Sequence, residues 1–253
     1  MKKVNLFVPL FLVLALFFTA CSKKQYAVKS IEGARIEMNS DWDNKADPGM
    51  VALVNSYKTK LDVEMHQEIG FADKTLVKGF PQSLLTNFTT DAMQDYASGS
   101  WGHIDFAVVN NGGLRATLNE GAVTVGDLYE VYPFENRLVL LELPGKAVKA
   151  FFDFIAFHGG EGLSKGIELV IRERKIKSLK ISGQTLDENK TYRIVTIDYL
   201  AEGNSGMEAL TQAVEYTDLN ITLRDAMIEF VKELTTENKR IDAKTDNRIK
   251  MEE

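Results

Sequence analysis

The spacing of hydrophobic positions changes several times between residues 48 and 234 of this chain. Some segments place apolar side chains three or four positions apart, which is typical of a helix with one buried face; they are residues 83–97, 146–157 and 222–234. Short continuous apolar runs indicate buried strands, over residues 104–109, 137–143, 166–171, 176–181 and 192–198. Because helices and strands are mixed without the regular alternation of a doubly wound sheet, the pattern predicts an α+β or irregular α/β fold.

Four further segments complete the prediction. Pro48 can begin a helix whose apolar residues run to Tyr57, and residues 61–69 are expected to continue it. Residues 123–131 predict a short helix. Residues 26–38 alternate loosely and predict a leading strand or hairpin, whereas the charged tail after Thr235 is expected to be frayed.

The first twenty residues are typical of an export signal. Lys2 and Lys3 precede an almost wholly apolar run that is too short for a good membrane span. The run ends at Phe18-Thr19-Ala20-Cys21, which resembles the lipobox of bacterial lipoproteins, where the cysteine is lipid-modified and becomes the N-terminus. An ordinary secretory signal with an idle cysteine is the alternative. We expect a signal peptide over residues 1–20 and lipidation at Cys21.

The composition indicates a folded domain without disulfides. Cys21 is the only cysteine, so an intramolecular disulfide is excluded and stability must come from a core. Removal of 20 of the 253 residues leaves 233, of a chain that is 45% hydrophobic, which is enough to form such a core. The net charge of −6 argues against nucleic acid as a general partner. A small anionic ligand is still compatible with a few local basic groups.

One segment carries candidate binding chemistry. The strand predicted over residues 104–109 leads into Asn110-Asn111-Gly112-Gly113-Leu114-Arg115. Glycines let the backbone approach a ligand and present amide donors, and the arginine fork can hold a phosphate through two hydrogen bonds. A tight turn followed by a surface arginine is the alternative. The segment is neither a Walker loop, because no Gly-Lys-Ser/Thr follows, nor a Rossmann fingerprint, because the spacing differs.

Further motifs follow this segment in order. They are Gly126-Asp127-Leu128-Tyr129, Tyr132-Pro133-Phe134-Glu135-Asn136, Leu141-Glu142-Leu143-Pro144-Gly145, Leu186-Asp187-Glu188-Asn189-Lys190-Thr191-Tyr192-Arg193 and Asp198-Tyr199-Leu200-Ala201-Glu202-Gly203. Together, over residues 79–234, the set resembles the C-terminal domain of the 5′-nucleotidase and UDP-sugar hydrolase family. The resemblance implies a layered α/β/β/α fold that holds the nucleotide. In that family a separate N-terminal metallophosphatase domain holds two metal ions.

The resemblance also implies roles for individual residues. Asn110 and Arg115, with Gly112 and Gly113 between them, match the family's sugar and phosphate region. Phe134 matches an aromatic that stacks on the base, and Asn136 matches a contact to the base edge. The other matched positions are Gly166, a ligand-side glycine, and Met207, which stands where the family has a second stacking aromatic.

Two further departures concern phosphate binding. Asn111 stands where the family has a glycine. The stretch Lys78-Gly79-Phe80-Pro81-Gln82-Ser83 lacks the arginine that normally precedes the first helix. The resemblance therefore implies weaker phosphate binding or a different ligand.

No metal motif is present in the sequence. The three histidines are His66, His103 and His158, and none belongs to an Asp-x-His, Asn-His-Asp/Glu or Gly-His-x-His pattern of a two-metal phosphoesterase. A Gly-x-Ser-x-Gly elbow is also absent. We therefore expect no catalytic residue and no cofactor in this chain, with divalent metals in a partner.

These observations lead to one functional hypothesis and two alternatives. We expect the nucleotide-binding subunit of a split 5′-nucleotidase-type phosphoester hydrolase, with metal-dependent chemistry supplied by a separately encoded metallophosphatase chain. The alternatives are a non-catalytic envelope lipoprotein that binds a nucleoside-like ligand, and a structural lipoprotein that retains only the fold. The expected location is the bacterial cell envelope, lipid-anchored to the inner or outer membrane and facing the periplasm. The expected organisation is a tether and leading strand over residues 21–39, a nucleotidase-like domain over 40–235 and a tail over 236–253.

Overall fold

A computed structural model describes residues 27–252, so the predicted signal peptide and Cys21 lie outside the described residues. Residues 27–38 form no regular secondary structure and their side chains are exposed, so the predicted leading strand is wrong for this stretch. Val28, Ile31 and Ile36 are three and five positions apart, so Ile31 would point to the opposite face of a strand. No helix within residues 27–252 is long and apolar enough to cross a membrane.

The chain divides into two units, Met1–Val51 and Ala52–Glu253. The first contains the 3-10 helix η1 (Ser40–Lys45), and the division falls within α2 (Pro48–Met65). This helix ends at Met65, four residues before the predicted end at Ile69. The last residues of the predicted helix belong instead to β1 (Glu68–Ala72). β1 packs closely on α7 (Leu223–Thr236): a Cβ at Gly70 would come within 2.5 Å of Val231 Cγ1.

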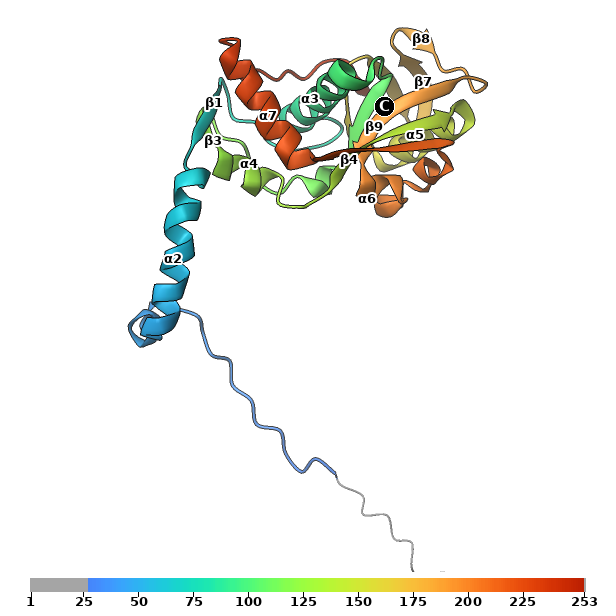
Figure 1. Cartoon of the computed structure of the whole chain (residues 1–253). Helices are drawn as coiled ribbons and strands as arrows, with labels where there is room; N and C mark the ends of the chain where they lie inside the picture. Colours follow the sequence, from blue (N-terminus) through green and yellow to red (C-terminus); the bar gives the residue numbers. More distant parts are fainter. Residues whose placement is uncertain (1–26, 253) are drawn as a thin grey trace, which may run out of the picture. The chain divides into compact units, whose positions relative to one another are not determined.

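The described part of the second unit, residues 52–252, contains three sheets. The largest has the order β10-β4-β9-β2-β5, with β2 (Phe106–Val109) parallel to β9 (Thr191–Ile197) and β4 (Arg137–Pro144) antiparallel to β9. Its outer strands are β5 (Gly162–Leu163) and β10 (Glu215–Thr222). β2 is buried along its whole length, and α3 (Leu84–Trp101) and α5 (Gly145–His158) both pack against the sheet (Figure 1).

A smaller sheet has the order β11-β6-β7-β8, and α5 contacts β7. Its strands are β6 (Ile167–Arg172), β7 (Lys175–Ile181), β8 (Gln184–Thr185) and β11 (Ile249–Glu252). The predicted helix over residues 123–131 is divided into β3 (Gly121–Thr124), which pairs with β1, and α4 (Val125–Val131). The short elements are α6 (Asp198–Ala201), η2 (Asn111–Gly113), η3 (Asn204–Gly206) and η4 (Glu208–Gln212). Helices and mixed sheets confirm the α+β fold.

The segment after α7 is packed against the domain and is not the frayed tail predicted from its charge. Ile241, Ala243 and Ile249 are buried, and β11 pairs in parallel with β6. Arg248 is also buried and forms ion pairs with Asp91 and Asp246. Arg248, one of the charges that indicated exposure, is therefore used in ion pairs within the domain.

Candidate functional site

Three neighbouring strands bring the candidate residues to one edge of the five-stranded sheet. β2 and β9 run in parallel, with Phe106 opposite Ile194, so Asn110 and α6 follow these strands at the same edge. β4 runs in the opposite direction, with Leu138 opposite Ile197, so the residues just before β4 lie at that edge as well. Ligands commonly bind at the carboxyl ends of parallel strands in such sheets.

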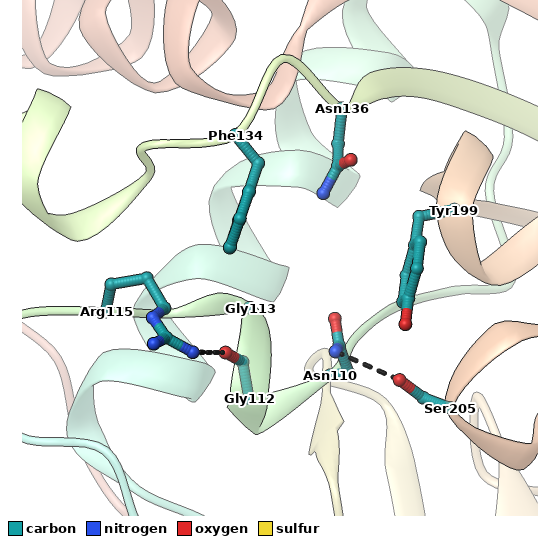
Figure 2. A pocket seen from close by; sticks show the side chains of 8 residues that line it. All are labelled: Asn110, Gly112, Gly113, Arg115, Phe134, Asn136, Tyr199 and Ser205. Carbon is teal, nitrogen blue, oxygen red and sulfur yellow. Dashed lines mark hydrogen bonds between the residues drawn. The ribbon is translucent and has the colours of Figure 1, made fainter. Parts of the chain in front are cut away.

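A pocket of about 360 Å³ lies at this edge and is lined by Asn110, Gly112, Gly113, Arg115, Phe134, Asn136, Tyr199 and Ser205. Two large aromatic side chains are unusually exposed there, Phe134 at 46% and Tyr199 at 41%. Figure 2 shows these rings on opposite sides of the pocket, with the carboxamides of Asn110 and Asn136 between them. Aromatic faces and a few polar groups around a concavity are typical of a small-molecule site.

Asn110 presents a free acceptor at the pocket. Its Nδ2 donates to Ser205 Oγ at 3.3 Å, whereas its Oδ1 is buried and has no hydrogen-bond partner within residues 27–252. In Figure 2 this oxygen points away from Ser205 and towards the pocket. Buried acceptors are normally satisfied, so a donor on a ligand would complete this one. Gly113 is required beside it, since a Cβ there would lie 2.8 Å from the same oxygen.

The backbone amides of this loop are mostly used inside the protein. The hydrogen bonds run from Asn111 N to Glu161 Oε1 at 2.6 Å, from Gly113 N to Asn110 O at 3.0 Å, from Leu114 N to Asn111 O at 3.3 Å and from Arg115 N to Val131 O at 2.9 Å. The expectation that the loop presents its amides to a ligand is therefore wrong for these four groups. Burial raises the pKa of Glu161, while its hydrogen bonds from the amides of Asn111 and Gly162 act in the opposite direction. The polar side chains that line the pocket are those of Asn110, Arg115, Asn136, Tyr199 and Ser205.

The two segments that depart from the family pattern are joined by side-chain hydrogen bonds. Asn111 Nδ2 donates to Gly79 O at 3.0 Å, so this side chain ties the loop to the segment before α3. Lys78 Nζ donates to Leu114 O at 2.7 Å, which places a cation beside the loop although the expected arginine is missing. Arg115 itself is exposed, with Nη1 3.3 Å from Gly112 O and Cζ 5.9 Å from the Phe134 ring centroid.

The loop that carries Phe134 is held by a buried arginine on α7. Arg224 is 5% exposed, and its Nη2 forms an ion pair with Glu135. Its Nη1 donates to Tyr132 O at 3.3 Å, and its Cζ lies 4.1 Å from the Tyr129 ring centroid. The guanidinium thus fixes residues on both sides of Phe134. The sequence did not reveal this role, because Arg224 lies in an ordinary amphipathic helix.

The structure brings six of the eight candidate binding residues to this pocket, the exceptions being Gly166 and Met207. Gly166 precedes β6 with φ +89° and lines a different hollow. Met207 is 1% exposed and lies in the core, so it does not line the pocket. Sequence reasoning missed Tyr199 and Ser205, although Tyr199 lies in one of the ordered motifs. The available signal was an aromatic residue directly after a buried strand.

The histidines lie apart from one another. His66 Nδ1 contacts Asp62 O, His158 Nδ1 contacts Phe154 O, and His103 Nε2 is 3.4 Å from Asp105 Oδ1. Within residues 27–252, no group of three or more His, Cys, Asp or Glu side chains is arranged to hold a metal ion. These residues do not fit a two-metal centre.

The fold and the site together define the class of protein. It is an α+β domain with a ligand-sized pocket at the ends of three adjacent strands. Residues 68–212, more than half of the chain, match the family described as 5′-nucleotidase, C-terminal domain. The chain belongs to this family, which confirms the resemblance drawn from its motifs.

Several relatives are similar over most of the chain. Protein UshA of Yersinia enterocolitica is 29% identical over 196 residues, covering 74% of this chain and 34% of that protein. The 5′-nucleotidase of Vibrio vulnificus is 28% identical over 198 residues, covering 74% and 35% respectively. A solved 5′-nucleotidase precursor from Thermus thermophilus has a TM-score of 0.68 at 26% identity, covering 78% of this chain and 42% of that one. The chain spans about a third of the length of the curated relatives it matches.

Proposed function

We propose that this chain is the nucleotide-binding subunit of a 5′-nucleotidase-type phosphoester hydrolase. The observation that carries the proposal is the pocket, where two exposed aromatic rings lie on opposite sides of two carboxamides and an arginine lies beside Phe134. A nucleotide offers matching groups: a flat base, polar base edges, a ribose and an anionic phosphate. The relatives named 5′-nucleotidase support the substrate class.

Four residues of the pocket have a role in this proposal. Phe134 stacks on the base, and Asn136 hydrogen-bonds its edge. Asn110 accepts a hydrogen bond through the Oδ1 that lacks a partner among the described residues. Arg115 is exposed beside Phe134, where its guanidinium can pair with a phosphate.

We propose further that a separately encoded metallophosphatase chain supplies the divalent metals and the hydrolytic chemistry. The matched 5′-nucleotidases are about three times as long as the part that this chain covers, which leaves room in them for such a domain. In phosphoester hydrolysis the metals generate the nucleophile and stabilise the phosphoryl oxygens. This chain's residues bind and orient the nucleotide, which lowers the barrier only when the second component is present.

A hydrolysis assay on three samples tests the split arrangement. The samples are this chain alone, the metallophosphatase partner alone, and their mixture, each with nucleoside monophosphates and manganese, zinc or cobalt. We expect turnover of nucleotides to rise in the mixture above that of the partner alone. Metal-dependent turnover by the purified chain alone would falsify the split.

The second candidate function is a non-catalytic envelope lipoprotein that binds a nucleoside-like ligand. The observation that favours it is the composition of the pocket, where Arg115 is the one charged residue among those that line it. Calorimetry with nucleosides and with nucleoside monophosphates separates the two candidates when combined with the mixing assay. Binding of both ligands with no gain of turnover on mixing supports this second function. Undetectable binding of either ligand rejects the pocket itself.

We propose that the chain is anchored to the bacterial envelope through lipid at Cys21. The support is the segment Phe18-Thr19-Ala20-Cys21, which lies outside the described residues. A Cys21→Ala variant is expected to leave the membrane fraction. Unchanged membrane association of that variant contradicts the anchor.

A further inference from the structure

The outer face of the sheet β11-β6-β7-β8 is strongly charged. Along β6 the side chains of Ile167, Leu169 and Ile171 are buried, so the alternate positions point outwards. Strand register extends this face to the neighbours: Lys180 lies opposite Glu168, Lys175 opposite Arg172, and Lys250 opposite Val170. The face therefore combines residues from β6, β7 and β11 on one surface.

Cations outnumber acids on this face. The cations on its strands are Arg172, Lys175, Lys177, Lys180 and Lys250, all exposed, and the acids on its strands are Glu168 and Glu252. Asp246, which borders a hollow on this face, is neutralised by its ion pair with Arg248. Five positive and two negative charges leave a net +3, although the whole chain carries −6. The charge is thus distributed asymmetrically, with the excess of acid on the rest of the chain.

The positive charge is only partly compensated. Lys177 Nζ pairs with Glu252 at 2.5 Å and Lys180 Nζ with Glu168 at 3.4 Å. Arg172, Lys175 and Lys250 form no ion pair with another described residue. The hydrogen bond from Lys177 lowers the pKa of Glu252, and the charges of Arg172 and Lys250 lower it further. The field at this face therefore favours anions.

We propose that this cationic face docks on the anionic lipid surface of the membrane that anchors the chain. The proposal rests on the lipid anchor at Cys21 and not on the ligand pocket. Lipid fits the face better than a protein partner does, because protein interfaces are depleted in lysine and built around apolar anchors. On the outer face of β6, Val170 is the only apolar side chain.

Because the lipid anchor holds the chain at the membrane, a weak electrostatic attraction is sufficient to dock the cationic face. Between Cys21 and the start of α2 lie 26 residues, which span at most about 90 Å when fully extended. A lipid at Cys21 therefore keeps the domain close to the bilayer, at a high effective concentration. Under these conditions a few lysines and arginines near anionic headgroups hold one face towards the membrane, and salt weakens the contact.

Vesicle sedimentation of the mature chain from residue 22 onward, made without its lipid, tests the face separately from the anchor. The vesicles contain phosphatidylcholine either alone or mixed with phosphatidylglycerol, at low and at physiological salt. The test variant is the double substitution Lys175→Glu and Lys250→Glu. The control is Lys146→Glu and Lys232→Glu, which changes the net charge equally at exposed positions on α5 and α7.

We expect binding only to the anionic vesicles, with affinity more than about tenfold lower in the test variant and little changed in the control. Equal losses in both double variants, or equal binding to neutral vesicles, overturn the proposal. Unchanged thermal melting of both variants establishes that folding is not the cause. Loss of membrane association in the Cys21→Ala variant reports on the anchor alone, so failure of the two proposals can be distinguished.

Discussion

Two arginines of this domain illustrate two different uses of the same side chain. Arg248 is 4% exposed, and its guanidinium donates to both carboxylate oxygens of Asp91, at 2.9 and 3.0 Å, and to Leu163 O at 2.8 Å. It also donates to both carboxylate oxygens of Asp246. Arg115 is exposed and makes one long hydrogen bond, to Gly112 O at 3.3 Å, within the described residues. The hydrogen-bond donors of the Arg248 guanidinium are therefore all used, whereas most of those of Arg115 are free to bind a ligand.

The comparison extends to the regions around each arginine. The segment from 237 to 252 uses its polar groups to hold the end of the chain against α3, β5 and β6. The pocket keeps an orphan acceptor on Asn110 and two exposed aromatic rings. Satisfied buried networks stabilise a fold, and unsatisfied groups around a concavity indicate a ligand. Substitutions in the first region should therefore affect stability, and substitutions in the pocket should affect ligand binding.

The largest expected effect is on stability, from Arg248→Ala. Removing one partner of a buried ion pair leaves uncompensated charges, which costs about 3–5 kcal/mol in general. The side chains of Asp91 and Asp246 are 30% and 47% exposed, so water can solvate them and the lower end of the range applies. Urea denaturation monitored by circular dichroism measures the loss. Ligand affinity of the molecules that remain folded should be unchanged.

Arg115→Ala is the matched control for stability. An exposed arginine with one long hydrogen bond is expected to change the free energy of unfolding by less than about 0.5 kcal/mol. A loss as large as that of Arg248→Ala contradicts the distinction between the two regions.

The second effect is on ligand affinity, from Phe134→Ala and Tyr199→Ala. Loss of an aromatic that stacks on a base costs about 1–3 kcal/mol of binding. We expect calorimetry to show such a loss for each variant, with both nucleosides and nucleotides, because both ligands carry the base. Phe157→Ala is the control, since Phe157 is also exposed but does not line the pocket. Unchanged affinity in Tyr199→Ala removes Tyr199 from the site.

The third effect distinguishes phosphorylated from bare ligands. Arg115→Ala should weaken binding of a nucleoside monophosphate by about 1 kcal/mol, the upper end of the range for an exposed ion pair, and should weaken binding of the nucleoside less. Arg115→Lys should restore part of the loss, because the charge is kept and the planar fork is not. Titration of both ligands against both variants measures the difference. Equal losses for the two ligands contradict a phosphate role for Arg115.

The sequence predicted the buried elements well because their apolar residues form either continuous runs or a helical repeat. The strands around residues 104–109 and 137–143, and the helix before Gly159, form close to where expected. The segment after α7 was mispredicted because charge indicates exposure unless the partners are known. Asp91 lies 157 positions before Arg248, so local spacing could not reveal their pairing.

The site was predicted in part for a similar reason. Motif order identified six pocket residues. Met207, however, is buried in the core, and Tyr199 lines the pocket although it was not predicted to. Gly206 explains part of this, because a Cβ there would lie 2.5 Å from the Phe154 ring, so the loop packs closely on α5. Such packing between distant segments determines which side of a loop faces the pocket, and the loop's own residues do not reveal it.

The smallest expected effect is the pH dependence of the Arg248 cluster. Burial alone would raise the pKa of Asp246, but the hydrogen bonds and charge of Arg248 outweigh it and hold the pKa below its ordinary value. The folded chain therefore binds fewer protons at this group than the unfolded chain. The resulting stability is fully present above the unfolded pKa of about 3.9 and is lost as the pH falls through the folded value. Thermal melting between neutral and acid pH should show a shallower acid loss in Asp246→Asn than in the unmutated chain. Glu168→Gln, at an exposed long pair, should leave the slope nearly unchanged. If the acid slopes of all three proteins coincide, the pairing of Asp246 with Arg248 does not contribute to stability, and the contrast with Arg115 then rests on Asp91 alone.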